Sequence, residues 1–535
     1  MPPLPSTVQL LEALVLPGAY PQPTQSVTII QTHASIVALT DAFAYKLKKE
    51  VHFGFMDFST LERRRFYCQE ELRLNQRLSE GIYLEVVPLY QYPDGRICFV
   101  PSPSGNIIEY AVKMRRLEES KFLIHLIGEA QFDPIRLDGL AEKLAHFYNT
   151  QTPSLEITQM GGLASVKRNC NENFFQTQSL APELCPPLLA KISQDYQVRF
   201  LEQHADWFAS REAQGKIKDG HGDIRAEHIY LEHNQYHLYD CIEFNPHFRC
   251  LDQLNDLAFL LMDFEFRGRA DLARYFAQKM LPMIEAAPVE PLLTFYKSYR
   301  AWVRGKVNAL KAAEAEIPAP QREESRLKAR RYFGLAAHYA LFGTRPQLVV
   351  VMGGVATGKS SLARALHQHL GWPHLNSDVV RKQLAGLPLT NLTPDSLQKK
   401  LYQPEMSQKV YQTLLEEATR LMQVWPGVVL DATFRQADYL LELSRRAHQQ
   451  DWGFHLLETF ASEEVVLQRL KNREVRPNVS DMRLEKYLQN KEAFQTSQRA
   501  LPAFQVNTEA SMGKVLKNLL LHWQMAAKNQ APLSI

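Results

Sequence analysis

Segments in which apolar and polar residues alternate dominate the first 120 residues of the chain. This alternation is typical of strands with one buried face, and it predicts strands over residues 26–32, 35–40, 43–49, 82–92, 96–101 and 109–117. Residues 59–79 interrupt the series with a charged stretch that favours a helix. The pattern therefore predicts a β-rich lobe with one prominent helix.

From about residue 124 the apolar spacing becomes helical. Helices are expected over residues 137–151, 186–215, 253–268, 291–315 and 326–343, with the proline- and charge-rich residues 316–325 as a linker. From residue 346 onward strands and helices alternate, which predicts a parallel α/β sheet. We expect two domains, at residues 1–343 (a β-rich lobe over about 1–123 and a helical lobe over about 124–343) and 344–535.

The strongest motif follows the apolar strand that begins this second domain. Gly353, Gly358, Lys359 and Ser360 satisfy G-x-x-x-x-G-K-S between a strand and an amphipathic helix. Glycines let backbone N–H groups face phosphates, the lysine neutralises β/γ oxygens, and the serine can bind Mg²⁺. The predicted site for ATP comprises Gly353, Gly354, Val355, Ala356, Thr357, Gly358, Lys359, Ser360 and Ser361.

Later residues supply partners for this loop. Asp431 ends a second apolar strand and is a candidate for the metal's shell, the alternative being a capping aspartate. Asp378, at an expected strand-to-helix junction, is a candidate base for a substrate hydroxyl, with Arg381 as a clamp. A helix N-cap followed by a surface arginine is the alternative reading.

Arg469 and Arg473 lie near a break in the predicted helices, where they could form a lid over the phosphates; a solvated charged helix is the alternative. With the loop and the D-x-x-R acid, residues 346–525 resemble the small-molecule kinases of the P-loop fold. These include the zeta-toxin, gluconate-kinase, chloramphenicol-phosphotransferase and polynucleotide-kinase families.

A second candidate site centres on "HGDIRAEHI", residues 221–229. In a kinase-type catalytic loop the base aspartate stands five residues before a metal ligand, and a second metal-binding aspartate follows a short hairpin. Asp223, His228 and Asp240 occupy these positions. A tight turn without catalytic function is the alternative.

Upstream, Lys46 and Lys48 share one face of a strand, and Lys46 is the preferred lysine for the α/β-phosphates. The next helix offers Glu70 and Glu71 as its partner, with Glu71 preferred; a solvated surface could carry the same charges.

The first half resembles the aminoglycoside-phosphotransferase and choline-kinase superfamily. More closely, the chain resembles bacterial proteins that fuse such a domain to a C-terminal P-loop ATPase, through stretches such as "AYKLKK", "EELRLNQRL", "HGDIRAEHI" and "YDCIEFNPHFRCLDQLNDLAFLLMD". This resemblance implies a two-domain architecture: an α+β bilobal protein-kinase-like fold followed by an α/β P-loop NTPase with a parallel sheet. His228 departs from the superfamily, which usually has asparagine there, and Mg²⁺ prefers oxygen ligands.

Composition narrows the function classes. The 535 residues are 45% hydrophobic, and the six cysteines form no CxxC pair, so zinc and disulfide frameworks are not indicated and a cytoplasmic setting is expected. No segment approaches about 18 uninterrupted apolar residues, so no membrane span is expected. From residue 343 onward, 23 Lys+Arg stand against 17 Asp+Glu, an excess too small to indicate nucleic acid.

We therefore predict an ATP- and Mg²⁺-dependent phosphotransferase with two nucleotide sites, transferring the γ-phosphate to a hydroxyl of a small molecule. The alternative is a nucleotide-responsive regulator with a catalytically weak kinase-like half and an ATP-hydrolysing P-loop half. A nucleic-acid end kinase is a third option that the weak positive charge disfavours.

Overall fold

The chain is represented by a computed structural model, which describes residues 6–54, 56–129, 131–389, 393, 397, 400–434, 437–474, 484–489 and 501–529. Within these residues the backbone forms two compact units. The first comprises residues 1–167, 204–263 and 275–286, and the second comprises residues 168–203, 264–274 and 287–535.

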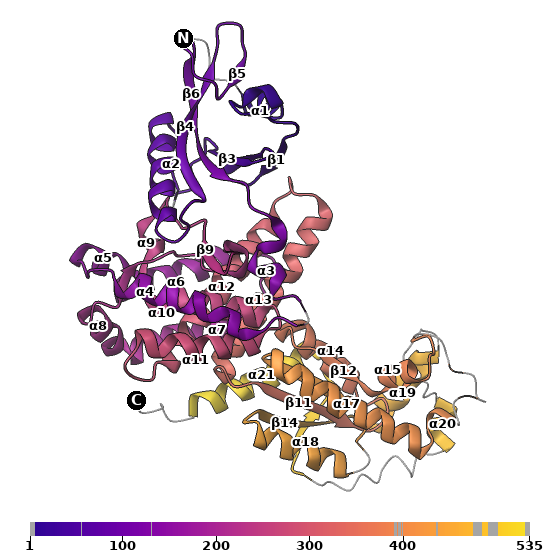
Figure 1. Cartoon of the computed structure of the whole chain (residues 1–535). Coiled ribbons are helices and arrows are strands. Elements are labelled where there is room, and N and C mark those ends of the chain that lie inside the picture. The colour runs from indigo at the N-terminus through magenta and orange to yellow at the C-terminus, as the bar shows by residue number, and fades with distance from the viewer. Residues whose placement is uncertain are drawn as a thin grey trace. The chain divides into compact units, whose positions relative to one another are not determined.

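An antiparallel six-stranded sheet forms one part of the first unit, in the order β1-β2-β3-β6-β4-β5 (Figure 1). Helix α2 packs against strands β4 and β6, which covers one face of the sheet. The strands and the long helix lie close to their predicted positions: β1 Thr28–Gln31, β2 Ser35–Leu39, β3 Phe43–Lys48, β4 Tyr83–Gln91, β5 Ile97–Cys98, β6 Asn106–Arg115 and α2 Leu61–Gln76. A short helix, α1 (Thr7–Leu14), precedes them.

The remainder of the first unit is mainly helical, as the spacing predicts. Two small antiparallel pairs, β7–β10 and β8–β9, frame the segment that contains "HGD". Its elements are α3 Leu123–Leu126, α4 Asp138–Asn149, α5 Leu155–Gly161, α8 Ala205–Ala213, β7 Ile217–Asp219, β8 Ile229–Glu232, β9 Gln235–Leu238, α9 Pro246–Arg249 and β10 Cys250–Asp252. Helices α6 (Leu163–Thr177), α10 (Gln253–Phe266) and α11 (Ala270–Ile284) contribute residues to both units.

The second unit contains a five-stranded parallel sheet in the order β12-β13-β11-β14-β15. Its central strand, β11, is buried along almost its whole length, which explains the continuous apolar run there. The strands are β11 Gln347–Gly353, β12 His374–Asn376, β13 Gly427–Asp431, β14 Gly453–Phe460 and β15 Phe504–Asn507. The helices around them are α14 Lys359–Leu370, α15 Ser377–Leu384, α17 Pro404–Val424, α18 Ala437–Gln449, α19 Glu463–Glu474, α20 Leu484–Gln489 and α21 Met512–Asn529 (Figure 1). The predicted fold class is confirmed.

Three helices that precede residue 344 also belong to the second unit: α7 (Pro187–Gln203), α12 (Glu290–Ala313) and α13 (Ala319–Phe342). Helix α13 packs on α12, on α7 and on α14. The expected linker at residues 316–325 is wrong in extent, because α13 already begins at Ala319 and makes a hairpin with α12. The compact units thus do not divide at residues 343 and 344, and the expected domain boundary stays a prediction.

The predicted long helix over residues 186–215 is two helices. It breaks at His204, whose backbone leaves the helical region at φ −124°, ψ 31°. Among the described residues, no helix is both long and apolar enough to cross a membrane.

Candidate functional site

Lys46 lies at the centre of the candidate site in the first unit. Its Nζ atom is 2.8 Å from Oε1 of Glu71 on α2 and 2.7 Å from Oδ1 of Asp240. Lys48, two residues further along β3, is enclosed between Glu71 and Glu243 with a side chain only 1% exposed, whereas that of Lys46 is 17% exposed. The structure therefore brings together the three predicted residues, and it separates the accessible lysine from the enclosed one.

Electrostatic effects keep Lys46 and Asp240 charged. Burial favours a lower pKa for Lys46, but the carboxylates of Asp240 and Glu71 outweigh it and raise the pKa well above its ordinary value. Burial likewise favours a higher pKa for Asp240, but Lys46 outweighs it and holds the pKa of that carboxyl well below its usual range. A fixed cation and a carboxylate side chain that is 41% exposed thus stand next to each other.

The carboxylate of Asp256 holds the "HGD" turn through hydrogen bonds. It accepts hydrogen bonds from the backbone N–H groups of His221 (2.8 Å) and Gly222 (2.9 Å), and from the hydroxyl of Tyr148 (3.0 Å). Gly222 has φ +85°, and a Cβ there would lie 2.8 Å from the carbonyl oxygen of Phe248, so the turn requires glycine. The motif is a constrained loop and not an ordinary surface turn.

Asp223, the candidate base, forms a bidentate ion pair with Arg225 at 2.8 Å for each contact. Both ring nitrogens of His228 also form hydrogen bonds. Its Nδ1 donates to the Asp223 carbonyl oxygen (2.9 Å), and its Nε2 accepts from Arg225 Nη2 (3.1 Å). Burial and the charge of Arg225 lower the pKa of His228, which is consistent with a neutral ring.

These contacts bear on the predicted metal role of His228. Nε2 is 3.7 Å from Asp240 Oδ2, but its lone pair already accepts from Arg225. The geometry gives that role no support. Sequence reasoning also assigned no role to Arg225, although its place two residues after Asp223 in the motif was a usable signal.

The phosphate loop of the second unit runs from the end of β11 to the start of α14. Gly353 (φ +141°) and Gly358 (φ +97°) adopt conformations open to glycine, and a Cβ on Gly353 would lie 2.4 Å from the Thr459 carbonyl oxygen. Lys359 Nζ donates to the Gly354 carbonyl at 2.6 Å. The remaining predicted residues of the loop, Val355, Ala356, Thr357, Ser360 and Ser361, lie between or beside these.

Asp431 ends strand β13, directly beside the loop's strand β11. Burial favours a higher pKa for Asp431, but His374, whose Nε2 atom lies 3.6 Å from Oδ2, together with Lys359 and Ser360 outweighs it and lowers the pKa. Asn376 Nδ2 also donates to Asp431 Oδ2 at 2.5 Å. Asp431 therefore ends the strand beside the phosphate loop, and its role in holding a metal ion stays a prediction.

Asp378 lies in the first turn of α15, but it is not the N-cap. Asn376 has that role, since its Oδ1 accepts from the N–H groups of Asp378 and Val379. Arg381 is 7% exposed and donates to the Leu401 carbonyl at 2.7 Å, so it is not the surface arginine of the alternative reading.

Arg469 reaches the phosphate loop from α19. Its Nη1 donates to the carbonyl of Ala356 (3.2 Å) and to Thr508 Oγ1 (3.0 Å), so it contacts the outside of the loop. The side chain of Arg473, the other predicted lid arginine, lies outside the described residues. Among the side chains that the structure describes, no group of three or more His, Cys, Asp or Glu is arranged to hold a metal ion.

A family model and two mycobacterial proteins match parts of this chain. The family model described as "AAA domain" matches residues 348–496. The Mycobacterium tuberculosis protein Rv2004c and the Mycobacterium bovis protein Mb2027c are each 32% identical to this chain over 409 residues, which cover 76% of it and 78% of each relative.

Two solved structures are similar at lower identity. A gluconokinase from Sinorhizobium meliloti is 20% identical with a TM-score of 0.25, covering 34% of this chain and 95% of the other. A spectinomycin phosphotransferase is 13% identical with a TM-score of 0.34, covering 64% and 99%.

The identity to the mycobacterial proteins over three quarters of the chain is the decisive similarity. The chain belongs to the family of these mycobacterial proteins, and within it residues 348–496 match the AAA-domain model.

Proposed function

We propose that the protein is an ATP-dependent phosphotransferase with two nucleotide sites, each of which transfers the γ-phosphate to a hydroxyl of a small molecule. The observation that carries the proposal is the phosphate loop: its glycine conformations, Lys359 directed back onto the loop, and Asp431 at the end of the neighbouring strand β13. Such a loop presents backbone N–H groups and a helix N-terminus to phosphates.

The second nucleotide site is proposed at Lys46. A lysine paired with a helix glutamate, next to the metal-binding aspartate that follows a hairpin, is the arrangement that kinase-type phosphoryl transfer needs. Lys46 would hold the α/β-phosphates, and Glu71 would orient Lys46. Asp223 would accept the proton of the acceptor hydroxyl.

Both sites contain the oxygen donors that Mg²⁺ prefers. In the P-loop half Ser360 and Asp431 would hold the ion, and in the other half Asp240 would hold it. The ion would neutralise charge on the transferred phosphoryl group. His228, an imidazole already engaged by Arg225, would position the catalytic loop instead.

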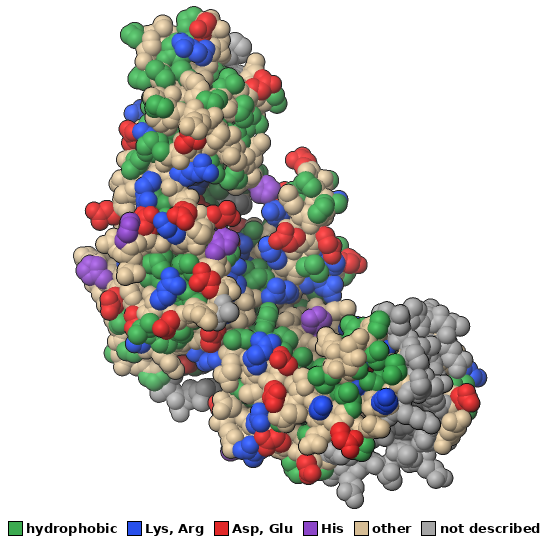
Figure 2. Space-filling model, turned by 45° about the vertical axis from the view of Figure 1, so that its right-hand side comes forward, with side chains coloured by type: hydrophobic (Ala, Val, Ile, Leu, Met, Phe, Trp, Pro, Cys, Tyr) green, Lys and Arg blue, Asp and Glu red, His purple; other side chains and the backbone are tan. Residues whose placement is uncertain are grey.

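A second candidate function is favoured by the pair of Asp223 with Arg225. A base held in a bidentate ion pair has part of its acceptor capacity occupied. The first unit would then bind nucleotide as a sensor, and the P-loop half would hydrolyse ATP. A nucleic-acid acceptor is disfavoured, because Lys/Arg and Asp/Glu side chains are interspersed over the face shown in Figure 2.

The test supplies the full chain with Mg·ATP and pooled sugars, nucleosides and aminoglycosides, and detects phosphorylated products by mass spectrometry. We expect products from the wild type, different subsets from Lys359→Ala and from Asp240→Asn, and none from the double variant. ATP hydrolysis that needs Lys359, with no acceptor phosphorylated in any pool, would favour the sensor function and overturn the transferase proposal.

A further inference from the structure

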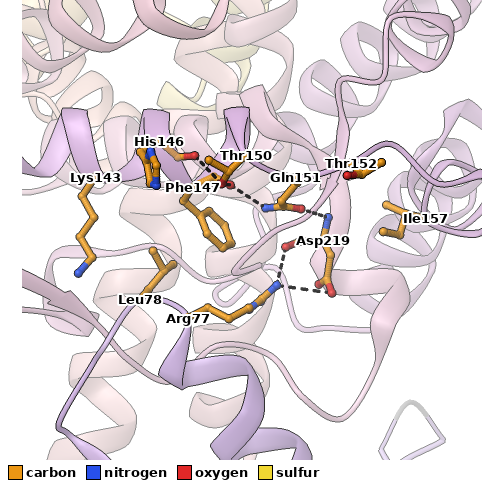
Figure 3. Close-up of a pocket in the computed structure, with 10 residues that line it drawn as sticks. All are labelled: Arg77, Leu78, Lys143, His146, Phe147, Thr150, Gln151, Thr152, Ile157 and Asp219. Carbon is orange, nitrogen blue, oxygen red and sulfur yellow. Dashed lines mark hydrogen bonds and ion pairs between the residues drawn. The ribbon is translucent and has the colours of Figure 1, made fainter.

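The first unit contains a cavity of about 650 Å³ that none of the candidate catalytic side chains lines. It lies between the end of α2, helix α4 and strand β7, and its lining includes Arg77, Lys143, His146, Phe147, Gln151 and Asp219 (Figure 3). Its volume lies in the range of small-molecule sites.

The cavity has an excess of positive charge. Asp219 is the acid in its lining, and that carboxylate is already paired: Arg249 Nε lies 2.5 Å from Oδ1 and Arg77 Nη1 lies 3.5 Å from Oδ2. Gln151 accepts the Asp219 backbone N–H at 3.0 Å. In Figure 3 dashed lines connect Arg77, Asp219 and Gln151, whereas none reaches Lys143.

Lys143 is the cation that remains for a ligand. Within the described part of the chain its ammonium has neither a hydrogen bond nor an ion pair, and Glu80 acts on it only at longer range. Burial lowers the pKa of Lys143, as expected for a half-buried ammonium without a partner. An unpaired charge in such a place is costly, and a bound anion would offset that cost.

We propose that this cavity binds a small phosphate-bearing molecule, with Lys143 as its direct cationic contact and Arg77 adding positive potential. The hydroxyl of Thr152, another lining residue, is a further donor of the kind that phosphate oxygens accept.

The position of the cavity couples it to the nucleotide site. Arg77 donates to the carbonyl oxygens of Asp219 and Gly220, each at 2.9 Å, immediately before the "HGD" turn. On the same helix, Asn75 Oδ1 accepts the backbone N–H of Cys241 at 2.9 Å, next to Asp240. A ligand that moves the end of α2 therefore acts on both segments, and we propose that it alters nucleotide affinity there. This second part rests on the proposed function of the first unit.

The test of the cavity uses acetylation of the full chain by acetic anhydride, followed by mass spectrometry of each lysine, with inorganic pyrophosphate as the probe. Lys167, an exposed lysine without an ion pair among the described residues, is the internal control. Pyrophosphate at ten times its Kd should slow acetylation of Lys143 about tenfold by mass action and leave Lys167 unchanged. Equal rates at Lys143 with and without about 10 mM pyrophosphate would overturn the site.

The test of coupling measures Mg·ATP affinity by calorimetry in Lys359→Ala protein, with and without pyrophosphate. Pyrophosphate also competes at nucleotide sites, so Lys143→Gln and the matched Lys167→Gln are compared. We expect a change of about fivefold or more that Lys143→Gln removes and Lys167→Gln keeps.

If pyrophosphate protects Lys143 but changes Mg·ATP affinity equally in Lys143→Gln and Lys167→Gln, the coupling is overturned and the site stands. Loss of all nucleotide binding in the first unit, with Lys143 still protected, would refute the proposed function and leave the cavity assignment standing.

Discussion

Arg225 binds both carboxylate oxygens of Asp223, each at 2.8 Å, from a guanidinium side chain that is only 6% exposed. A carboxylate offers about four acceptor directions, and the bidentate pair uses two. The pair therefore fixes the orientation of the candidate base and occupies part of its acceptor capacity. Whether that orientation serves catalysis or restrains it can be measured.

Replacing Arg225 by lysine tests this relationship. Arg225→Lys keeps the charge but loses the bidentate geometry, so we expect turnover by the first unit to fall about 10- to 100-fold in Lys359→Ala protein. Mg·ATP affinity should stay constant, since Arg225 acts on Asp223 and His228, whereas Lys46 and Asp240 are the proposed contacts of the nucleotide and the metal ion. A rise in turnover would instead identify Arg225 as a restraint and favour the sensor function.

The two lysines of β3 should behave differently. Lys46→Met should abolish Mg·ATP binding by the first unit, because this is the partly exposed cation next to Asp240. Lys48→Met should destabilise the unit by about 3 kcal/mol, because it leaves Glu243 buried without its ion-pair partner.

Calorimetry and urea unfolding in Lys359→Ala protein measure the two effects. Lys49→Met, at the neighbouring position, should change neither. Retained nucleotide binding in Lys46→Met together with its loss in a folded Lys48→Met would reverse the assignment.

Variants at Asp378 and Asn376 distinguish a chemical role from a helix-capping role in α15. Asp378→Asn should leave ATP binding unchanged and remove transfer by the P-loop half, because a base in the proposed role would contact the acceptor hydroxyl and not the nucleotide. Asn376→Ala should cost about 1 kcal/mol through the lost N-cap. If Asp378→Asn retains full transfer in a phosphorylation assay, Asp378 is not the base.

Close packing of α13 on α14 gives a stability prediction. A Cβ on Gly334 would lie 2.4 Å from the His369 carbonyl oxygen, so Gly334→Ala should destabilise the second unit by about 2 kcal/mol. Gly513→Ala is the matched control, because nothing lies within 4 Å of its Cβ position. Thermal unfolding of both variants measures the difference, and equal midpoints would show that the helices can separate at little cost.

His221 should make the stability of the first unit depend on pH. Burial, partly opposed by Asp256, lowers its pKa to about 4 from an ordinary value of 6.5. The folded state therefore binds fewer protons than the unfolded state in this interval, and stability falls as pH decreases through it.

Between pH 6.5 and 5 the loss should be about 1.6 kcal/mol, since the slope reaches its full value of about 1.4 kcal/mol per pH unit only below pH 6. His221→Gln keeps a donor for the Tyr239 carbonyl but does not titrate here, so its urea unfolding should vary less between these pH values. Parallel curves for the two proteins would contradict the assignment.

Much of the fold and part of the site could be predicted from sequence because they depend on local pattern. The β11 strand, the glycine spacing of the phosphate loop and the hairpin after "HGD" each lie within a few consecutive residues. His233 and Asn234 at positive φ close that hairpin with two residues, as a short polar turn between alternating strands predicts.

The site contacts depend on residues far apart in the chain. Alternation places Lys46 and Lys48 on the same face of β3, and only packing against α2 and the segment around residue 240 makes one accessible and encloses the other. Similarly, Arg381 could not be recognised as buried, because its partner Leu401 lies in a different segment.

By itself the sequence determined the glycine spacing of the phosphate loop, the hairpin after "HGD" and the fold class of each half, because backbone conformation and side-chain periodicity are local properties. Only the tertiary structure decided that Lys46 lies beside Asp240 while Lys48 is enclosed, that α13 packs on α14, and that a cavity lined by Arg77 and Lys143 lies between α2, α4 and β7. Those features arise from contacts between segments that lie far apart in the chain, and their spacing carries no periodic pattern.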